Sequence, residues 1–145
     1  MSARLRVVRL LPVLDFGGVE SRAILQSRWH DRARYELTVV AFAGDGAAAA
    51  AIRDAGVPVR ILGTSPAVRN PKATLLLTRA LRELRPDVLH ASIAEGNFHG
   101  ILAGRLARVP VVIAEEVGAP SHGRLARVVY GQLYRHASAV VGVTQ

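Results

Sequence analysis

One stretch decides the fold: Val7-Val8-Arg9-Leu10-Leu11-Pro12-Val13-Leu14-Asp15-Phe16-Gly17-Gly18-Val19-Glu20. Its apolar start is typical of a buried strand, and the residues after the glycine pair recur at helical spacing. A strand that turns tightly into a helix directs free backbone N–H groups toward an anion above the sheet. Glycine there permits a positive φ and a close approach of phosphate. The competing interpretation is that Gly17 and Gly18 only form the turn.

Strand-like runs alternate with helical segments along the whole chain. Strands are expected at residues 5–11, 35–42, 57–62, 87–91, 109–114 and 139–143. This alternation predicts an α/β fold, a Rossmann-like open parallel sheet of about six strands with helices on both faces. Ligands bind beyond the carboxyl ends of such strands, so the residues that follow each strand are the candidates for a site.

Composition limits the classes of partner. The net charge of +8 favours a polyanion such as acidic lipid, nucleic acid or a phosphorylated substrate. The arginines are scattered, and three Phe, three Tyr and one Trp are too few for a base-stacking surface, so nucleic acid is not expected. The absence of cysteine excludes disulfides, thiolate zinc sites and a cysteine nucleophile. No apolar run approaches the ~18 residues of a membrane span, and we expect a cytoplasmic protein.

The glycine turn does not match two common nucleotide-binding motifs. Residues 15–20 fit neither G-x-G-x-x-G nor a Walker loop, which argues against a nicotinamide dehydrogenase and a nucleoside triphosphatase. Glu20 falls in the first helical turn, where a carboxylate also stabilises a helix without any further role.

A polar group is expected after the fourth strand. His90 is predicted to end that strand, and Glu95 and Asn97 are predicted to follow within one loop. A histidine there can hydrogen-bond a sugar hydroxyl or act as an acid or base. A packed histidine with satisfied hydrogen bonds is the competing interpretation.

An adjacent carboxylate pair is predicted to open the loop 115–122. Strand alternation sends the side chains of Glu115 and Glu116 in opposite directions, so at most one faces a given cleft. This argues against a paired-carboxylate hydrolase. The histidines outside the fourth strand show no ligand spacing, so no metal site is expected.

Five landmarks in the right order make the whole chain resemble the amino-terminal, acceptor-side domain of a retaining glycosyltransferase of the GT-B fold, in glycosyltransferase family 4. They are residues 17–20 (Gly-Gly-Val-Glu), 54–59 (Asp-Ala-Gly-Val-Pro-Val), 85–90 (Arg-Pro-Asp-Val-Leu-His), 103–112 (Ala-Gly-Arg-Leu-Ala-Arg-Val-Pro-Val-Val) and 139–144 (Ala-Val-Val-Gly-Val-Thr).

The resemblance implies an enzyme that transfers a hexose-type sugar from a nucleotide-sugar to a glycan or lipid-linked acceptor. Gly17 and Gly18 would then contact the donor diphosphate with main-chain N–H groups. The acceptor side would be lined by Glu20, His90, Glu95 and Asn97. No cofactor and no metal are implied, because the nucleotide-sugar is a substrate.

Two departures from the family pattern shape the expectations. Many relatives carry a histidine that orients the transferred sugar where this chain has Glu116, which leaves Glu116 as a weak catalytic candidate. The nucleotide-sugar-binding C-terminal domain is expected to be absent from residues 1–145, so the chain is expected to be inactive alone.

Peripheral contact with the inner face of the membrane is also expected, since several family members use lipid-linked acceptors. The residues concerned are Arg124, Arg127 and Arg135 with Leu125, Val128, Val129 and Leu133; a core-packing helix with a solvated basic face is the competing interpretation. Two rival functions remain open. One is a non-catalytic Rossmann-like module that binds a phosphorylated small molecule or a partner protein. The other, less favoured by the glycine pattern, is a dinucleotide-dependent oxidoreductase or epimerase.

Overall fold

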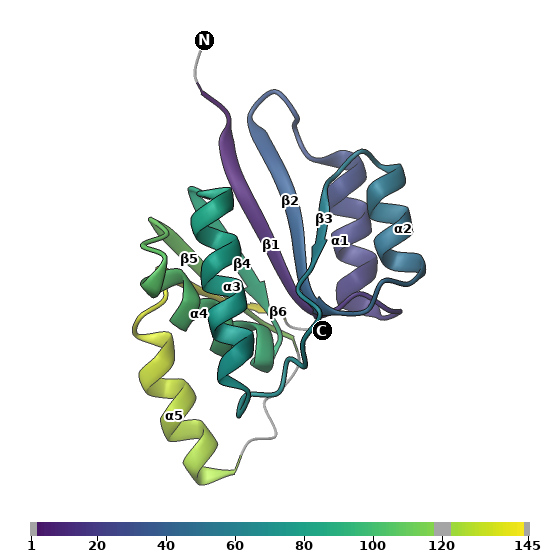
Figure 1. Ribbon diagram of the computed structural model, residues 1–145. Helices are drawn as coiled ribbons and strands as arrows, with labels where there is room; N and C mark the ends of the chain where they lie inside the picture. Colours follow the sequence, from purple (N-terminus) through teal and green to yellow (C-terminus); the bar gives the residue numbers. More distant parts are fainter. Residues whose placement is uncertain (1–2, 118–122, 144–145) are drawn as a thin grey trace.

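The structure is a computed structural model that describes residues 3–117 and 123–143. Strands and helices alternate from one end to the other, as predicted (Figure 1). The strands are β1 (Leu5–Val13), β2 (Tyr35–Ala43), β3 (Val59–Ile61), β4 (Val88–Ser92), β5 (Val111–Val117) and β6 (Ala139–Val143). The helices are α1 (Gly18–Trp29), α2 (Ala47–Asp54), α3 (Pro71–Leu84), α4 (Ala94–Leu106) and α5 (Arg124–Tyr134).

The predicted element bounds are wrong at two places near the expected site. α4 begins at Ala94, so Glu95 and Asn97 lie in the first turns of a helix and not in a loop. β5 continues to Val117, so Glu115 and Glu116 belong to a strand. The strand outlasts its apolar run because β4 and β6 still pair with it at these positions. The rest of the predicted loop, residues 118–122, lies outside the described residues.

The sheet confirms the predicted topology. All six strands are parallel, in the order β3-β2-β1-β4-β5-β6. The order reverses direction at β1, which has β2 on one side and β4 on the other. The turns that follow β1 and β4 therefore meet at a topological switch point, where open α/β sheets bind their ligands.

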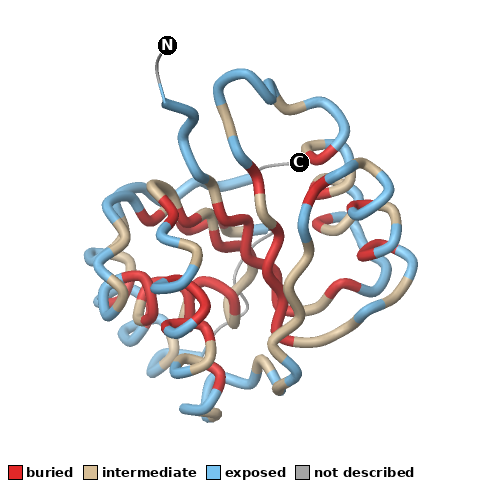
Figure 2. Tube along the Cα trace, turned by 45° about the horizontal axis from the view of Figure 1, so that its top comes forward, coloured by how far each residue is buried: buried red, intermediate tan, exposed pale blue. Residues whose placement is uncertain are grey.

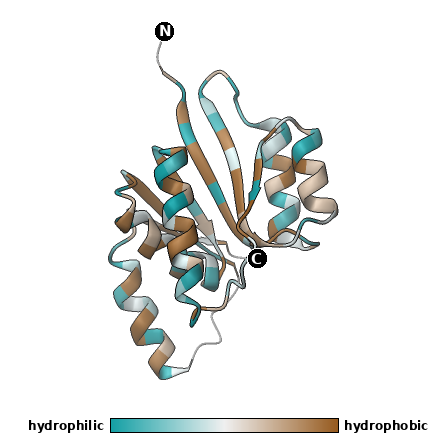
Figure 3. Cartoon of the chain, in the orientation of Figure 1, coloured by the Kyte–Doolittle hydropathy of each residue, from teal (hydrophilic) through white to brown (hydrophobic). Residues whose placement is uncertain are grey.

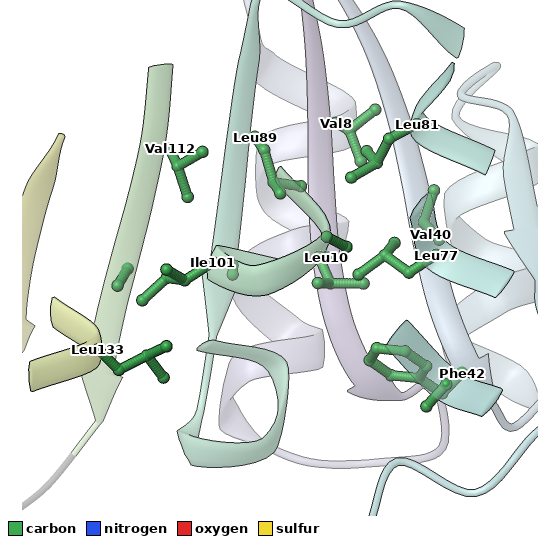
Figure 4. Close-up of a cluster of buried hydrophobic side chains, with 14 of the residues drawn as sticks. Val8, Leu10, Val40, Phe42, Leu77, Leu81, Leu89, Ile101, Val112 and Leu133 are labelled. Carbon is green, nitrogen blue, oxygen red and sulfur yellow. The ribbon is translucent and has the colours of Figure 1, made fainter. Parts of the chain in front are cut away.

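Each face of the sheet has its own apolar layer, because successive side chains of a strand point to opposite faces. One layer joins Leu10 of β1 and Phe42 of β2 to α3, α4 and α5 (Figure 4). The other joins Leu11 of β1 and Val39 of β2 to α1 and α2. Buried residues accordingly concentrate along the middle strands (Figure 2). The continuous apolar runs of the sequence are explained by this two-sided burial.

Two glycines let α4 lie close to the sheet. A Cβ atom on Gly100 would stand 2.8 Å from the Cβ of Ala91, and one on Gly104 would stand 2.8 Å from a methyl group of Val112. Neither neighbour is the far end of a flexible side chain, so glycine is required at both positions. This packing brings the amino end of α4 against the carboxyl ends of β4 and β5.

Candidate functional site

The glycine turn lies at the carboxyl edge of the sheet, between β1 and α1. Gly17 is the N-cap of α1 with φ −179° and ψ −179°, so the expectation of a positive φ is wrong there. A Cβ on Gly17 would stand 2.5 Å from Oε2 of Glu20, the end of a flexible side chain that can move aside, so the turn does not strictly require glycine at this position. A Cβ on Gly18 would meet no atom within 4 Å. The backbone at Gly18 is therefore open to approach.

The amide groups of this turn have no protein acceptor. The first hydrogen bond that closes a turn of α1 runs from the Ser21 amide to the Gly17 carbonyl, at 3.0 Å. Among the described residues, the amides of Gly17 and Gly18 make no hydrogen bond. Unpaired amides at the positive end of a helix dipole form an anion-binding feature. No ligand contact tests this role, so the donor-phosphate role of both glycines stays a prediction.

A buried carboxylate lies beside this turn, on the α1 face of the sheet. The side chain of Glu115, on β5, is only 4% exposed and Arg9, on β1, is only 3% exposed. Arg9 Nη2 donates to Glu115 Oε2 at 2.7 Å, and the Ser92 hydroxyl donates to the same oxygen at 3.0 Å. The strand register β1–β4–β5 brings these side chains together.

Two further groups complete the cluster around Glu115. Arg22, one turn into α1, places Nη1 2.5 Å from Glu115 Oε1, and His90 of β4 places Nε2 2.9 Å from Oε2. Neither approach has the alignment of a hydrogen bond. The Glu115 cluster, as we call Arg9, Arg22, His90, Ser92 and Glu115, thus joins α1 to three neighbouring strands.

The electrostatics of the cluster follow from burial. Burial acts to raise the pKa of the Glu115 carboxyl, but the charge and hydrogen bond of Arg9, the hydroxyl of Ser92 and the charge of Arg22 outweigh it and lower the pKa. Burial lowers the pKa of His90 to about 4, and the positive charge of Arg9 acts in the same direction. His90 is therefore neutral at pH 7. Two arginines face one carboxylate, so the cluster carries one positive charge in excess.

Comparison with known proteins identifies the family. Residues 17–145 match the sequence profile of the glycosyl transferase 4-like domain. The chain belongs to this family. The matched region includes the glycine turn, strands β2 to β6 and all of the Glu115 cluster except Arg9. Arg9 belongs to β1, which precedes the matched region and pairs with β2 and β4. No curated protein sequence matches the chain significantly.

Solved structures support the fold. A glycosyltransferase from Rickettsia africae matches 99% of the chain with a TM-score of 0.74 and 12% identity. S. aureus MnaA, in its structure with UDP, matches 94% with a TM-score of 0.68 and 14% identity. A UDP-N-acetylglucosamine 2-epimerase from Listeria monocytogenes matches 95% with a TM-score of 0.63 and 14% identity.

The chain spans 38% of the length of each of these three proteins. At such identities the likeness establishes the fold alone. Together with the family match, it confirms the resemblance to an amino-terminal family 4-like domain of the GT-B fold.

The structure of this glycosyl transferase 4-like domain separates the predicted site residues into groups. Glu20 lies over the glycine turn, with its carboxylate against Gly17. His90 is the third of five residues of β4 and not its last, and it belongs to the Glu115 cluster. Glu95 and Glu116 lie toward the opposite face, where their charges, after burial itself, raise the pKa of Tyr130 to about 12. The alternation predicted for Glu115 and Glu116 is confirmed.

Asn97 has a structural task in this domain. It is fully buried in α4, its amide donates to the Glu115 carbonyl at 3.0 Å, and its carbonyl oxygen accepts from the Glu115 amide at 3.2 Å. The preceding turn contains Ile93 with φ +67°, a conformation that is costly for a β-branched residue. Its amide donates to the Glu115 carbonyl as well, at 3.1 Å. A ligand-binding role for Asn97 stays a prediction.

Sequence reasoning missed the core of the cluster: Arg9, Arg22, Ser92 and Glu115. The sequence contains one signal for this cluster, which is Arg9 within the apolar run of β1. A strand covered by helices on both faces buries its side chains, so an arginine in it needs a buried acidic partner. Which acidic residue supplies that partner depends on strand order and register. Among the described residues, no three His, Asp or Glu side chains are placed to hold a metal ion.

Proposed function

We propose that this domain is the acceptor-binding half of a nucleotide-sugar-dependent, retaining glycosyltransferase that transfers a hexose-type sugar to a glycan or lipid-linked acceptor. The observation that carries the proposal is the pair of unpaired amides at Gly17 and Gly18, at the switch point of a family 4-like fold. A diphosphate is the group that such amides would stabilise as the leaving group departs.

The charges around the turn support an anionic ligand. Arg22 lies one helical turn from Gly18, and its side chain is 38% exposed. Arg9 and Arg22 together leave the cluster with one positive charge in excess of Glu115. That charge and the positive end of the α1 dipole both favour an anion at the carboxyl edge, against the single Glu20 carboxylate that lies over Gly17. The donor-binding residues themselves would come from a second domain, which we place outside residues 1–145.

His90 suits acceptor binding better than base catalysis. A group with a pKa of about 4 has little proton affinity at neutral pH, so it is a poor general base. A neutral imidazole that is 24% exposed can still accept or donate a hydrogen bond to a sugar hydroxyl. We therefore assign His90 to acceptor orientation, with Glu20, Glu95 and Asn97 as further acceptor-side candidates and Glu116 as the weak catalytic candidate.

A Gly18→Val substitution tests the diphosphate contact. A Cβ atom at this position meets no protein atom within 4 Å, so the fold is expected to survive while the larger side chain keeps phosphate from the amides. In a protein that joins this chain to a donor-binding half, sugar transfer is expected to fall about 100-fold. The matched control is Gly123→Val, at the open N-cap of α5, which is expected to retain transfer.

Three results would count against the proposal. Equal activity of both variants would remove the phosphate role of the glycine turn. Failure of the joined protein with every nucleotide-sugar in a broad panel would favour the non-catalytic module. Tight NAD(P) binding to the isolated chain would favour a dinucleotide enzyme.

Peripheral contact with an anionic membrane is part of the proposal, and α5 is the surface concerned. Tyr130 and Leu133 pack onto the domain, while Leu125, Val128 and Val129 are 78%, 62% and 42% exposed. Figure 3 shows hydrophobic and hydrophilic residues interspersed along α5. The apolar residues of α5 that were expected to form one face therefore divide into two groups: Leu133 is buried in the core, whereas Leu125 and Val128 face solvent. Among the described residues, no helix is long and apolar enough to cross a membrane.

Vesicles that contain anionic lipid are expected to sediment the protein at low salt, since arginines flank the exposed apolar residues. A Leu125→Ser, Val128→Ser variant is expected to stay in solution. Equal sedimentation of the two proteins, or none of either, would refute membrane contact through α5.

A further inference from the structure

A cavity lies at the opposite edge of the sheet from the glycine turn. It has a volume of about 400 Å³ and is formed where α1 ends and β1 and β2 begin. Val7 and Leu37 contribute its apolar floor. The twelve residues of α1 separate it from Gly18 by about 18 Å, so it is distinct from the proposed transfer site.

Aromatic rings border this cavity. Trp29, the last residue of α1 and the single tryptophan of the chain, is 82% exposed beside it. Tyr35, the first residue of β2, lines it as well. An indole with so much free surface buries little area in this fold, and its position at the rim of a cavity leaves the ring available to a ligand.

Polar groups with free hydrogen-bonding capacity line the same cavity. Nδ1 of His30 lies 3.1 Å and 3.2 Å from two carbonyl oxygens of α1, which leaves Nε2 available to a ligand. Oδ1 of Asp31 accepts from the Ala33 amide at 2.9 Å. Within residues 3–117 and 123–143, Asp31 Oδ2, the Gln26 side-chain amide and the Tyr35 hydroxyl make no hydrogen bond.

The charge of the lining selects against anions. Asp31 contributes a carboxylate, and the described lining residues include no arginine or lysine, in a chain whose net charge is +8. The Asp31 carboxylate therefore disfavours a phosphate or nucleotide among these lining residues. A purely aliphatic ligand would desolvate Gln26, His30 and Asp31 without replacing their hydrogen bonds.

We propose that this cavity is a carbohydrate-binding site for a neutral sugar of one or two rings. A pyranose offers a C–H face that stacks on Trp29 and hydroxyl groups that pair with Asp31, Gln26 and His30. The volume lies in the range of small-ligand sites. An adjoining hollow of about 130 Å³ shares His30, Tyr35 and Leu37 with the cavity, and Arg4, Arg32 and Glu36 add charged hydrogen-bonding groups of both signs there. Sugar binding at this cavity is inferred from its lining residues alone. Only the identification of that sugar as part of the acceptor rests on the proposed function.

The single tryptophan makes the test specific. The isolated chain is titrated with maltotriose, mannotriose and N-acetylated chitotriose while Trp29 emission is recorded. At least one trisaccharide is expected to give a saturable blue shift, because stacking removes water from the indole. UDP and inorganic phosphate are expected to give none. This measurement needs no donor-binding half, so its failure is separate from a failure of sugar transfer.

Variants then locate the binding. By saturation-transfer NMR, Trp29→Ala is expected to weaken the responding trisaccharide about 10-fold or more, and Trp29→Phe less, since a ring remains. The matched control is Phe16→Ala, an aromatic 87% exposed at the other edge of the sheet, which is expected to bind normally. No shift with any of the three sugars, an equal loss in the control, or a shift with UDP would overturn the proposal.

Discussion

Replacing Glu115 with glutamine is expected to destabilise the domain by about 3–5 kcal/mol. The substitution keeps the size of the side chain but removes the one negative charge that faces Arg9 and Arg22. Arg9 is 3% exposed and would be left as a buried cation without a counter-charge. Urea unfolding followed by circular dichroism at pH 7 measures the loss.

Glu116→Gln is the matched control, one residue further along β5. Its side chain points to the other face and meets the Asn97 amide at a long 3.4 Å. We expect a change within about 0.5 kcal/mol. Equal costs for the two substitutions would show that the cluster does not stabilise the fold through charge.

A second background keeps the test informative where Glu115→Gln alone does not fold. Arg9→Met removes the buried cation, so the carboxylate loses its principal partner. The cost of Glu115→Gln is then expected to be smaller by at least about 1 kcal/mol in a double-mutant cycle. An unchanged cost in the Arg9→Met background would contradict direct coupling between the two side chains.

The domain is also expected to lose stability as the pH falls from about 6.5 to about 4. The pKa of His90 is about 4 in the folded chain and about 6.5 in the unfolded chain. Between these values the unfolded state binds the proton and the folded state does not, so acid favours unfolding. The full effect of this one group is about 3 kcal/mol.

Glu115 acts in the same direction at lower pH, because its folded pKa is lowered and its stabilisation is lost as it is protonated. His90→Gln removes the titration and is expected to flatten the pH dependence of the unfolding free energy between pH 6.5 and 4. An equally steep dependence in the His90→Gln variant would refute the assignment.

The sheet could be predicted from the sequence because local signals agree with the tertiary structure. Runs such as Leu10–Leu11 and Val39–Val40 are apolar on both faces, and Gly56 ends α2 with φ +77°. The helix–sheet alternation then leaves few topologies. The family resemblance rested on five short landmarks, and the profile match to residues 17–145 confirms it.

The Glu115 cluster could not be predicted in full, since its members are linked only by strand pairing. Arg9 and Glu115 are separated by more than a hundred residues, and no local pattern pairs them. The predicted end of β5, at residue 114, is wrong for a related reason. Two consecutive glutamates favour a loop on propensity, but hydrogen bonds to β4 and β6 extend the strand through them.

The contact between Arg22 and Glu115 has a consequence for how a ligand would meet α1. It fastens the first two turns of that helix to a central strand of the sheet, so the segment after Gly18 is held in place before anything binds. A helix held in this way loses little conformational entropy when an anion binds, so this loss does not weaken the binding affinity. The amino end of α1, where we propose that an anion binds, is in this sense preorganised through the buried carboxylate of Glu115.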